Sequence, residues 1–251
     1  MLMNIERLSS WYGKTQILRE ISFDLVQGQC LAVLGRNGVG KTTLMRSLMG
    51  LCDRTTGSIR MLGEEVVDVP THARCKHGIG YIPQGRQIFG KFTVRENILL
   101  GSFARPDGKT EVPELCLSLF PYLAENLDRR AGLLSGGQQQ QLAIARALAV
   151  NPKMLLLDEP TEGIQPNIVA EIGHKLKMLN KELGITLILT EQHIKVARQL
   201  SDAFLMMDNG RIVAQGSIDE LTDELVEKHM TVQRPCQREP GLALIKKRRD
   251  R

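Results

Sequence analysis

The chain has 251 residues, 42% of them hydrophobic, which suits one large α/β unit or two closely joined lobes and excludes a mainly disordered chain. No apolar run approaches the roughly 20 residues that cross a bilayer, and the first residues lack a secretion signal, so we expect a cytoplasmic protein. The net charge of +5 includes one dense basic cluster, residues 246–249, which favours a solvated tail over contact with anionic headgroups and gives no reason to expect a nucleic-acid partner.

The five cysteines, at positions 30, 52, 75, 116 and 236, show no C-x-x-C pair and no zinc-type spacing. We therefore predict reduced, structural thiols.

Strands and turns dominate residues 3–83, where the polar segments 53–60 and 63–70 separate short apolar pieces.

A glycine-rich segment follows the apolar run 30–34 and precedes a helical pattern at 43–49. It fits G-x-x-x-x-G-K-[ST] at each fixed position, a pattern whose backbone N–H groups surround phosphate oxygens. Lys41 would bring a cation to the outer phosphates, and the Thr42 hydroxyl could bind Mg²⁺. The helix would point its N-terminus at the phosphates and end near Gly50. The predicted nucleotide-binding residues are Gly35, Arg36, Asn37, Gly38, Val39, Gly40, Lys41, Thr42 and Thr43.

Residues 84–150 have a helical character, interrupted at 103–108, resumed at 115–120 and ended by Asn151-Pro152. Within them, Ser135 can cap a helix, and Gln138 stands three residues on, as a capping box requires. Gly136 and Gly137 between them would let an anion approach the free amides. We predict a second anion-binding helix start here.

The apolar run 154–157 predicts a buried strand that ends in Asp158 and Glu159. Ligands of open α/β sheets bind at the carboxyl ends of strands, so Asp158 can hold Mg²⁺ directly or through water, and Glu159 is the candidate general base. A helix near 168–183, a strand at 185–190 that leads to His193, and a hairpin turning at Asn209-Gly210 complete the pattern.

The chain resembles the ATP-binding subunit of an ABC transporter over about residues 3–232. The resemblance is carried, in this order, by the phosphate loop, Gln84, the Leu134–Gln138 motif, the strand ending at Glu159, and His193. The resemblance implies a P-loop NTPase (RecA-like) α/β core with an antiparallel β subdomain and an inserted α-helical subdomain. It assigns residues 1–83 and 151–232 to the ATP-binding core, 84–150 to the helical subdomain and 233–251 to a C-terminal tail.

The resemblance also implies roles for single residues. Tyr12, rather than Trp11, would stack on adenine, with packing at a strand edge as the alternative. Gln84 would reach Mg²⁺ and the attacking water, unless it is an ordinary polar loop residue. His193 would contact the γ-phosphate. The implied catalytic residues are Glu159, His193 and Gln84, and the implied Mg²⁺ ligands are Thr42, Gln84 and Asp158. The aspartate usual in the family at position 165 is replaced by Gln165, which leaves the coupling of paired sites open.

In this family two ATP-binding subunits face each other head to tail, so Ser135, Gly136, Gly137 and Gln138 would complete the partner's ATP site. The resemblance implies ATP and Mg²⁺ as cofactors, a second, non-identical ATPase subunit, two membrane permeases, a periplasmic binding protein, and a position at the inner face of the plasma membrane. Exposed Ile88, Phe89 and Phe92, beside Arg86 and Lys91, are the candidate permease groove, although they could also fill the core of the helical subdomain.

The segments 83–89, 135–142 and 161–166 are similar to those of the urea importer in the branched-chain amino acid and urea uptake group. The sequence therefore predicts the ATPase subunit of a binding-protein-dependent importer for urea. An importer of branched-chain amino acids or another small amide is the alternative. A soluble ABC ATPase that acts on nucleic acid is less favoured, because the chain has neither a second ATPase domain nor a long coiled-coil insertion.

Overall fold

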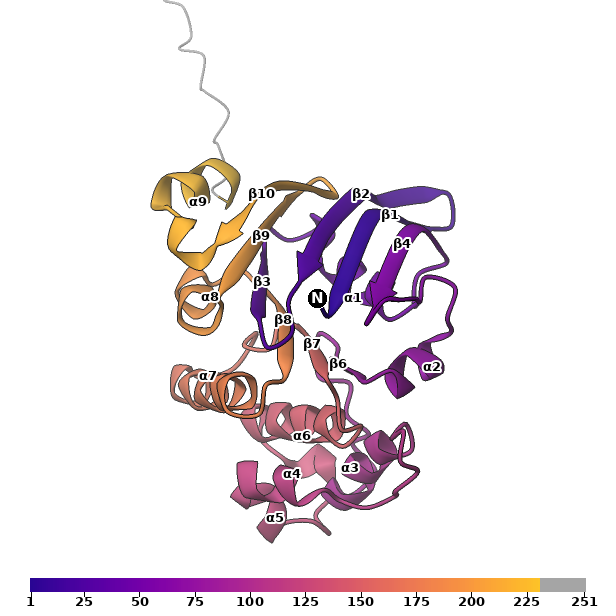
Figure 1. Cartoon of the computed structure of the whole chain (residues 1–251). Helices are drawn as coiled ribbons and strands as arrows, with labels where there is room; N and C mark the ends of the chain where they lie inside the picture. Colours follow the sequence, from indigo (N-terminus) through magenta and orange to yellow (C-terminus); the bar gives the residue numbers. More distant parts are fainter. Residues whose placement is uncertain (231–251) are drawn as a thin grey trace, which may run out of the picture.

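The computed structural model describes residues 1–230, so the basic cluster at 246–249 and Cys236 lie outside the described residues. Strands and helices form two sheets with helices around them (Figure 1). The strands are β1 (Met3–Tyr12), β2 (Thr15–Leu25), β3 (Cys30–Leu34), β4 (Arg54–Met61), β5 (Glu64–Glu65), β6 (Ile79–Ile82), β7 (Met154–Asp158), β8 (Thr186–Glu191), β9 (Ala203–Asp208) and β10 (Arg211–Ser217). The helices are α1 (Lys41–Leu48), α2 (Thr71–Lys76), α3 (Val94–Ser102), α4 (Glu114–Leu119), α5 (Pro121–Glu125), α6 (Gly136–Leu148), α7 (Pro166–Lys181), α8 (Ile194–Leu200) and α9 (Asp223–Met230).

The first sheet has four strands in the order β2-β1-β4-β5, and the pairs are antiparallel. The second has six strands in the order β10-β9-β3-β8-β7-β6. Its strands run parallel except for β10, which returns antiparallel to β9 through the turn at Asn209-Gly210. The hairpin predicted at this Asn-Gly pair is therefore confirmed.

The central strands of the six-stranded sheet are buried on both faces, which explains their continuous apolar runs. In β3, Cys30, Ala32 and Leu34 pack into a core with the helices α6 and α7, whereas Leu31 and Val33 pack into a second core with α1 and the antiparallel sheet. Because side chains alternate along a strand, one short strand supplies both cores. Helix α1 thus lies between the two sheets, which fixes the loop that precedes it.

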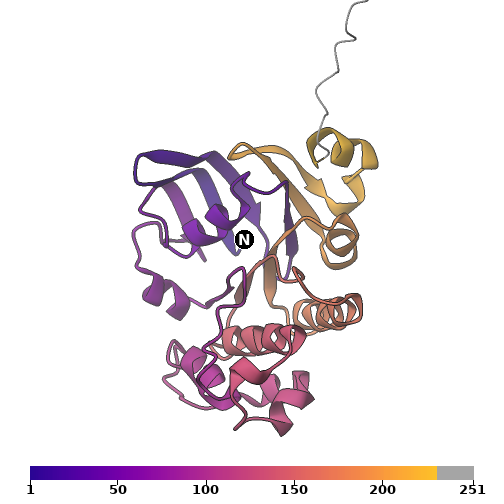
Figure 2. The ribbon, with the colours of Figure 1, turned by 180° about the vertical axis from the view of Figure 1, so that it is seen from behind.

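Helices α3, α4, α5 and α6 gather beyond the β6–β7 edge of the six-stranded sheet, away from the antiparallel sheet (Figure 1). The view from behind shows the same separation (Figure 2). The predicted fold class, an α/β core with an antiparallel β subdomain and an inserted helical group, is confirmed. The exact domain boundaries stay a prediction. Within residues 1–230, no helix is long and apolar enough to cross a membrane.

Candidate nucleotide site

The phosphate loop connects β3 to α1, as the sequence predicts. Gly40, the residue before α1, has a left-handed φ of +111°, and a Cβ on it would lie 3.0 Å from Leu18 Cδ2, so glycine suits this position. Lys41 is buried, and its Nζ donates to the carbonyl oxygens of Gly35 at 2.8 Å and Arg36 at 3.1 Å. The lysine charge is therefore fixed against the inside of the loop.

A cavity of about 360 Å³ opens at this loop. It is lined by residues from β1, β2, the phosphate loop, α1 and the loops after β6 and β7: Tyr12, Ile17, Asn37, Gly38, Gly40, Lys41, Thr42, Thr43, Gln84 and Glu159. Gly35 and Arg36 line a neighbouring cavity of about 510 Å³ together with Gln192. The structure thus brings together predicted residues that are far apart in the sequence.

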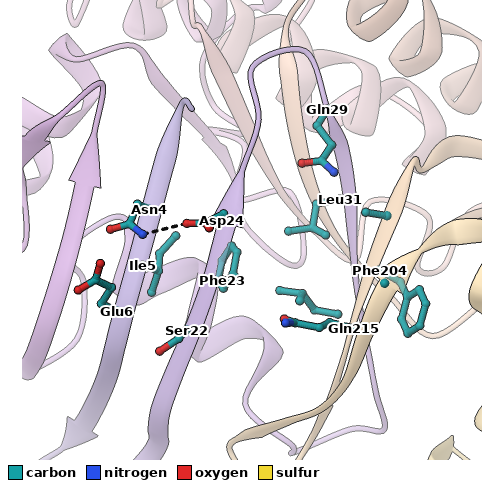
Figure 3. Close-up of a pocket in the computed structure, with 13 residues that line it drawn as sticks. Asn4, Ile5, Glu6, Ser22, Phe23, Asp24, Gln29, Leu31, Phe204 and Gln215 are labelled. Carbon is teal, nitrogen blue, oxygen red and sulfur yellow. Dashed lines mark hydrogen bonds between the residues drawn. The ribbon is translucent and has the colours of Figure 1, made fainter.

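A larger cavity of about 600 Å³ lies between the antiparallel sheet and strands β3, β9 and β10 (Figure 3). Its charged lining residues among those described are the carboxylates Glu6 and Asp24, and Asp24 accepts a hydrogen bond from Asn4 at 2.8 Å. Neither lysine nor arginine is among those lining residues. Because a polyphosphate needs donors and positive charge, the smaller cavity at Lys41 is the candidate nucleotide site despite its size.

Asp158, the last residue of β7, is buried at the carboxyl end of the sheet. Its Oδ1 accepts hydrogen bonds from Thr42 Oγ1 at 3.2 Å and Thr190 Oγ1 at 2.7 Å. Its Oδ2 is buried without a hydrogen-bond partner among the described residues. Burial raises the pKa of Asp158, and the two hydroxyl donors oppose that shift. An unsatisfied carboxylate oxygen beside a threonine hydroxyl fits a hard divalent cation.

Glu159 follows Asp158 with a left-handed φ of +49°, an uncommon conformation for a residue with a side chain. Its amide donates to Thr190 Oγ1 at 2.8 Å, so one hydroxyl orients both acidic residues. Its Oε1 lies 3.3 Å from Lys41 Nζ, with 4% of the lysine side chain and 7% of the glutamate side chain exposed. The pair is therefore a buried ion pair at the base of the cavity.

Two side-chain amides also hold the Glu159 carboxylate. Gln84 Nε2 donates to its Oε2 at 3.1 Å, and Gln192 Nε2 donates to its Oε1 at 2.9 Å. Gln84 Nε2 also donates to Glu162 Oε2 at 2.9 Å. Gln84 thus links the loop after β6 to two carboxylates, which is a more specific arrangement than an ordinary polar loop residue has.

Tyr12 ends β1 and lines the cavity, with the Arg46 guanidinium carbon 5.3 Å from its ring centroid. Trp11 instead packs against Arg54, whose guanidinium carbon lies 4.0 Å from the Trp11 ring centroid, and Trp11 does not line the cavity. Burial, followed by the neighbouring Cys52, raises the pKa of the Tyr12 phenol to about 12, so its hydroxyl stays protonated. The geometry favours Tyr12 over Trp11 as an aromatic platform.

The start of α6 does not reach this cavity. Ser135 caps the helix in the predicted capping box: Gln138 N donates to Ser135 Oγ at 3.4 Å, and Ser135 N donates to Gln138 Oε1 at 2.9 Å. Ser135 is exposed, and Gly136 and Gly137 are half-buried. The capped helix start is therefore exposed at Ser135 and takes no part in lining the Lys41 cavity of its own chain.

His193 is exposed at the start of α8 and does not line the Lys41 cavity. The structure instead brings Gln192, its neighbour in the sequence, into contact with Glu159. Sequence reasoning missed Gln192, Thr190, Glu162 and Ile17. The rule that strand carboxyl ends meet at one edge would have found Thr190 and Gln192, because β8 is the parallel neighbour of β7 and pairs Thr190 with Asp158.

The fold and this cavity define a P-loop nucleotide-binding cassette with an acidic pair at the end of the adjacent strand. Residues 18–162 match the model of the ABC transporter family, and the chain belongs to that family. It is an ATP-binding subunit of the family and an ATPase.

Curated relatives cover most of the chain. It is 40% identical over 213 residues to the high-affinity branched-chain amino acid transport ATP-binding protein BraG of Pseudomonas aeruginosa, covering 84% of this chain and 91% of that protein. It is 33% identical over 224 residues to the probable branched-chain amino acid transport ATP-binding protein LivF of Archaeoglobus fulgidus, covering 88% and 94%. It is 36% identical over 222 residues to the Nod factor export ATP-binding protein I of Rhizobium etli, covering 87% and 69%.

Solved structures agree with the fold. A nucleotide-free ATP-binding cassette from an ABC transporter matches with a TM-score of 0.76 and 26% identity, covering 91% of this chain and 94% of that chain. The ADP conformation of MJ1267, an ATP-binding cassette of an ABC transporter, matches with a TM-score of 0.74 and 26% identity, covering 87% of this chain and 92% of that chain.

Proposed function

We propose that the chain is the ATP-hydrolysing subunit of a binding-protein-dependent importer for branched-chain amino acids. The observation that supports this choice of transported solute is the 40% identity to a branched-chain amino acid transport ATP-binding protein across 91% of its length. The export relative is covered over only 69% of its length, whereas the two branched-chain amino acid relatives are covered over 91% and 94% of theirs, which favours import. Urea, the cargo that the sequence motifs favour, is the competing solute, and the comparisons do not support it specifically.

In the proposed reaction, Lys41 neutralises the outer phosphates, the loop amides surround them and Tyr12 stacks on adenine. The arrangement around Glu159 supports its role as the base that accepts a proton from the attacking water, with Gln84 and Gln192 orienting its carboxylate. His193 would have to move to contact a γ-phosphate in this site.

We propose Thr42, Asp158 and Gln84 as the residues that hold Mg²⁺. The buried, unpartnered Asp158 Oδ2 supports this set. When bound, Mg²⁺ would neutralise charge on the β- and γ-phosphates. Asp158→Asn should weaken Mg²⁺-dependent ATP binding, and titration with ATP in Mg²⁺ and in EDTA measures the difference.

We propose that the site is completed by a second ATP-binding subunit, and that in the transporter this subunit is not identical to the chain. Support comes from the capped start of α6, a helix N-terminus suited to an anion, which is exposed at Ser135 yet does not line the cavity of its own chain. A head-to-tail pair would bring Ser135, Gly136, Gly137 and Gln138 to the partner's phosphates. Ser135→Arg should then abolish hydrolysis while ATP still binds at Lys41.

A groove of about 390 Å³ beside the helical group is the proposed permease-docking site. Phe89 and Phe92 are 50% and 42% exposed, and their rings stack with centroids 5.5 Å apart. Ile88, by contrast, packs against the core. Of the three apolar residues predicted to form the groove, Ile88 therefore fits the alternative of a core residue. Phe89→Asp should abolish co-purification of two permeases from membranes, and retention of both would argue against this groove. Such co-purification with the unmodified chain would also exclude a soluble ATPase that acts on nucleic acid.

The deciding experiment is uptake of labelled leucine and labelled urea in source cells that lack this chain. Complementation with the wild-type chain or with Lys41→Ala provides the control for ATP use. Loss of leucine uptake that only the wild-type chain restores supports the proposed cargo. Loss of urea uptake alone would move the assignment to urea, and unchanged uptake of both solutes would refute both assignments.

A further inference from the structure

Arg146, in the last turn of α6, holds the backbone of the loop that follows Gln84. Its Nη1 donates to the Gln87 carbonyl at 2.8 Å, and its Nη2 donates to the Arg86 carbonyl at 2.9 Å. Helix α3 packs so closely at Gly101 that no Cβ would fit between it and the Arg146 carbonyl. The guanidinium therefore extends from a closely packed backbone, and its two hydrogen bonds fix two consecutive peptide groups.

The loop that it holds has an unusual conformation. Gly85, Arg86 and Gln87 have successive left-handed φ angles of +73°, +67° and +43°. Two of them carry side chains, which disfavour this region, so the conformation persists only where surrounding contacts impose it. The Arg146 hydrogen bonds end on the carbonyls of these two residues. Arg146 is therefore the side chain that stabilises the turn from α6.

The turn has functional residues on both sides. Gln84 precedes it and donates to Glu159 and Glu162. Phe89 follows it, and its ring centroid lies 5.6 Å from the Arg146 guanidinium carbon. Arg146 and Phe89 also line the same groove. One guanidinium thus contacts both the groove and the backbone that carries Gln84.

The Arg86 side chain extends this connection. Its guanidinium lies 3.3 Å from the position that a Cβ on Gly136 would occupy, and its Nη2 lies 3.5 Å from the Glu162 carbonyl oxygen. Arg86, one of the two residues whose carbonyls accept from Arg146, therefore lies between the start of α6 and the loop after β7. A shift of the turn at residues 85–87 would therefore change its contacts with both the start of α6 and the loop after β7.

Arginine is specifically suited to this position. Its planar fork can donate to two carbonyls at once, whereas a lysine ammonium is a point charge that lacks this geometry. Burial lowers the pKa of Arg146, and none of the ion pairs within residues 1–230 includes it. The Arg146 guanidinium therefore interacts with neutral carbonyls and an aromatic ring rather than with a carboxylate.

We propose that Arg146 is a positioning residue that fixes Gln84 relative to the groove at Phe89, so that occupation of the groove and the geometry of Gln84 change together. This inference rests on the roles given to Gln84 and to the groove in the proposed function. It predicts that removing the fork releases the turn and slows hydrolysis while the Lys41 cavity still binds ATP.

The first test is hydrogen exchange of the full chain with Arg146→Lys, which keeps the charge and removes the fork. Arg95→Lys is the matched control, because Arg95 lies in α3 and its exposed side chain donates to the exposed Asp128 carboxylate rather than to the turn. We expect amides of residues 85–89 to exchange about tenfold faster in Arg146→Lys, with exchange in α6 unchanged, and no change in Arg95→Lys. Unchanged exchange at 85–89 would overturn the inference, and faster exchange throughout α3 and α6 would reduce Arg146 to a structural residue.

The second test is a double-mutant cycle on steady-state ATP hydrolysis. If Arg146 acts through Gln84, Arg146→Lys lowers kcat several-fold with the ATP Kd unchanged, and adding it to Gln84→Ala causes no further loss. Fully additive losses would overturn the inference while leaving the role of Gln84 intact. Normal turnover of Gln84→Ala alone would instead refute that role, so the two failures are distinguishable.

Discussion

Glu159→Gln tests both the chemistry of the site and the ion pair beneath it. Glu159 Oε1 and Lys41 Nζ are 3.3 Å apart, which at an effective dielectric constant of about 20 gives a gross attraction of about 5 kcal/mol. Breaking a buried pair by removing one charge costs about 3–5 kcal/mol of stability. Lys41 keeps its bonds to the Gly35 and Arg36 carbonyls, so we expect the lower end, about 3 kcal/mol.

For a chain of this size, each kcal/mol lowers the melting temperature by about 2–4 °C, so Glu159→Gln should melt about 6–12 °C below wild type without nucleotide. Added MgATP should recover much of that loss, because phosphates replace the missing negative charge and binding itself stabilises the folded state. Hydrolysis should fall by about 10²–10⁴-fold, the usual contribution of a general base. Thermal melts and a phosphate-release assay measure both effects.

Glu162→Gln is the matched control, because Glu162 also accepts a hydrogen bond from Gln84 but is exposed and does not contact Lys41. Its melting temperature should stay close to that of wild type, since exposed substitutions change stability by about 0.5 kcal/mol or less. Turnover of Glu159→Gln near the wild-type rate would refute its role as base. An unchanged melting temperature would refute the ion-pair argument even if turnover fell.

Three further predictions concern other parts of the chain. Tyr12→Ala should weaken ATP binding by about tenfold whereas Tyr12→Phe should not, because stacking on a base contributes about 1–3 kcal/mol; fluorescent-nucleotide titration checks this. Burial raises the pKa of Cys30 and Cys116 to about 12, so both should resist maleimide at pH 8 until the chain is unfolded, as mass spectrometry would show. Burial also raises the pKa of Glu191 above its ordinary 4.5, so ionising its native carboxyl lowers stability by an amount that builds up from about pH 4.5 to the raised native pKa and is constant above it. Glu191→Gln should therefore stabilise the chain more at pH 8 than at pH 5 in urea unfolding.

Features that depend on neighbouring residues could be predicted from the sequence. The phosphate loop needs glycines and a lysine at fixed spacing, the α6 start needs Ser135 and Gln138 three residues apart, and the hairpin needs Asn209-Gly210. Each is decided within one turn of backbone, where local hydrogen bonds and allowed φ angles determine the conformation.

Contacts that depend on strand register and helix packing could not be predicted in the same way. Gln192 reaches Glu159 because β8 pairs with β7 in a register that puts Thr190 beside Asp158. Arg146 reaches the Arg86 and Gln87 carbonyls because α6 packs beside the turn after Gln84. Neither residue belongs to a short motif that would identify its partner. The rule on strand carboxyl ends places Gln192 near the acidic pair, but the individual contact with Glu159 and both contacts of Arg146 follow from register and packing in the fold.

The same distinction explains why the cargo is harder to infer than the chemistry. The proposed reaction uses Lys41, Asp158 and Glu159, which lie together at the carboxyl ends of the strands of the six-stranded sheet. These groups would act on phosphates and water whichever solute is transported. A solute preference can reach this chain only through the subunits that it contacts, and the proposed contact is the groove at Phe89. The urea interpretation came from segments 83–89, 135–142 and 161–166, in which Gln84 lines the ATP site, 135–142 begins α6 and only Phe89 lines the groove. Residues that line the groove are therefore a better guide to the transporter than the motifs of the ATP site, and exchanging them with those of a transporter of known cargo should change which permeases co-purify.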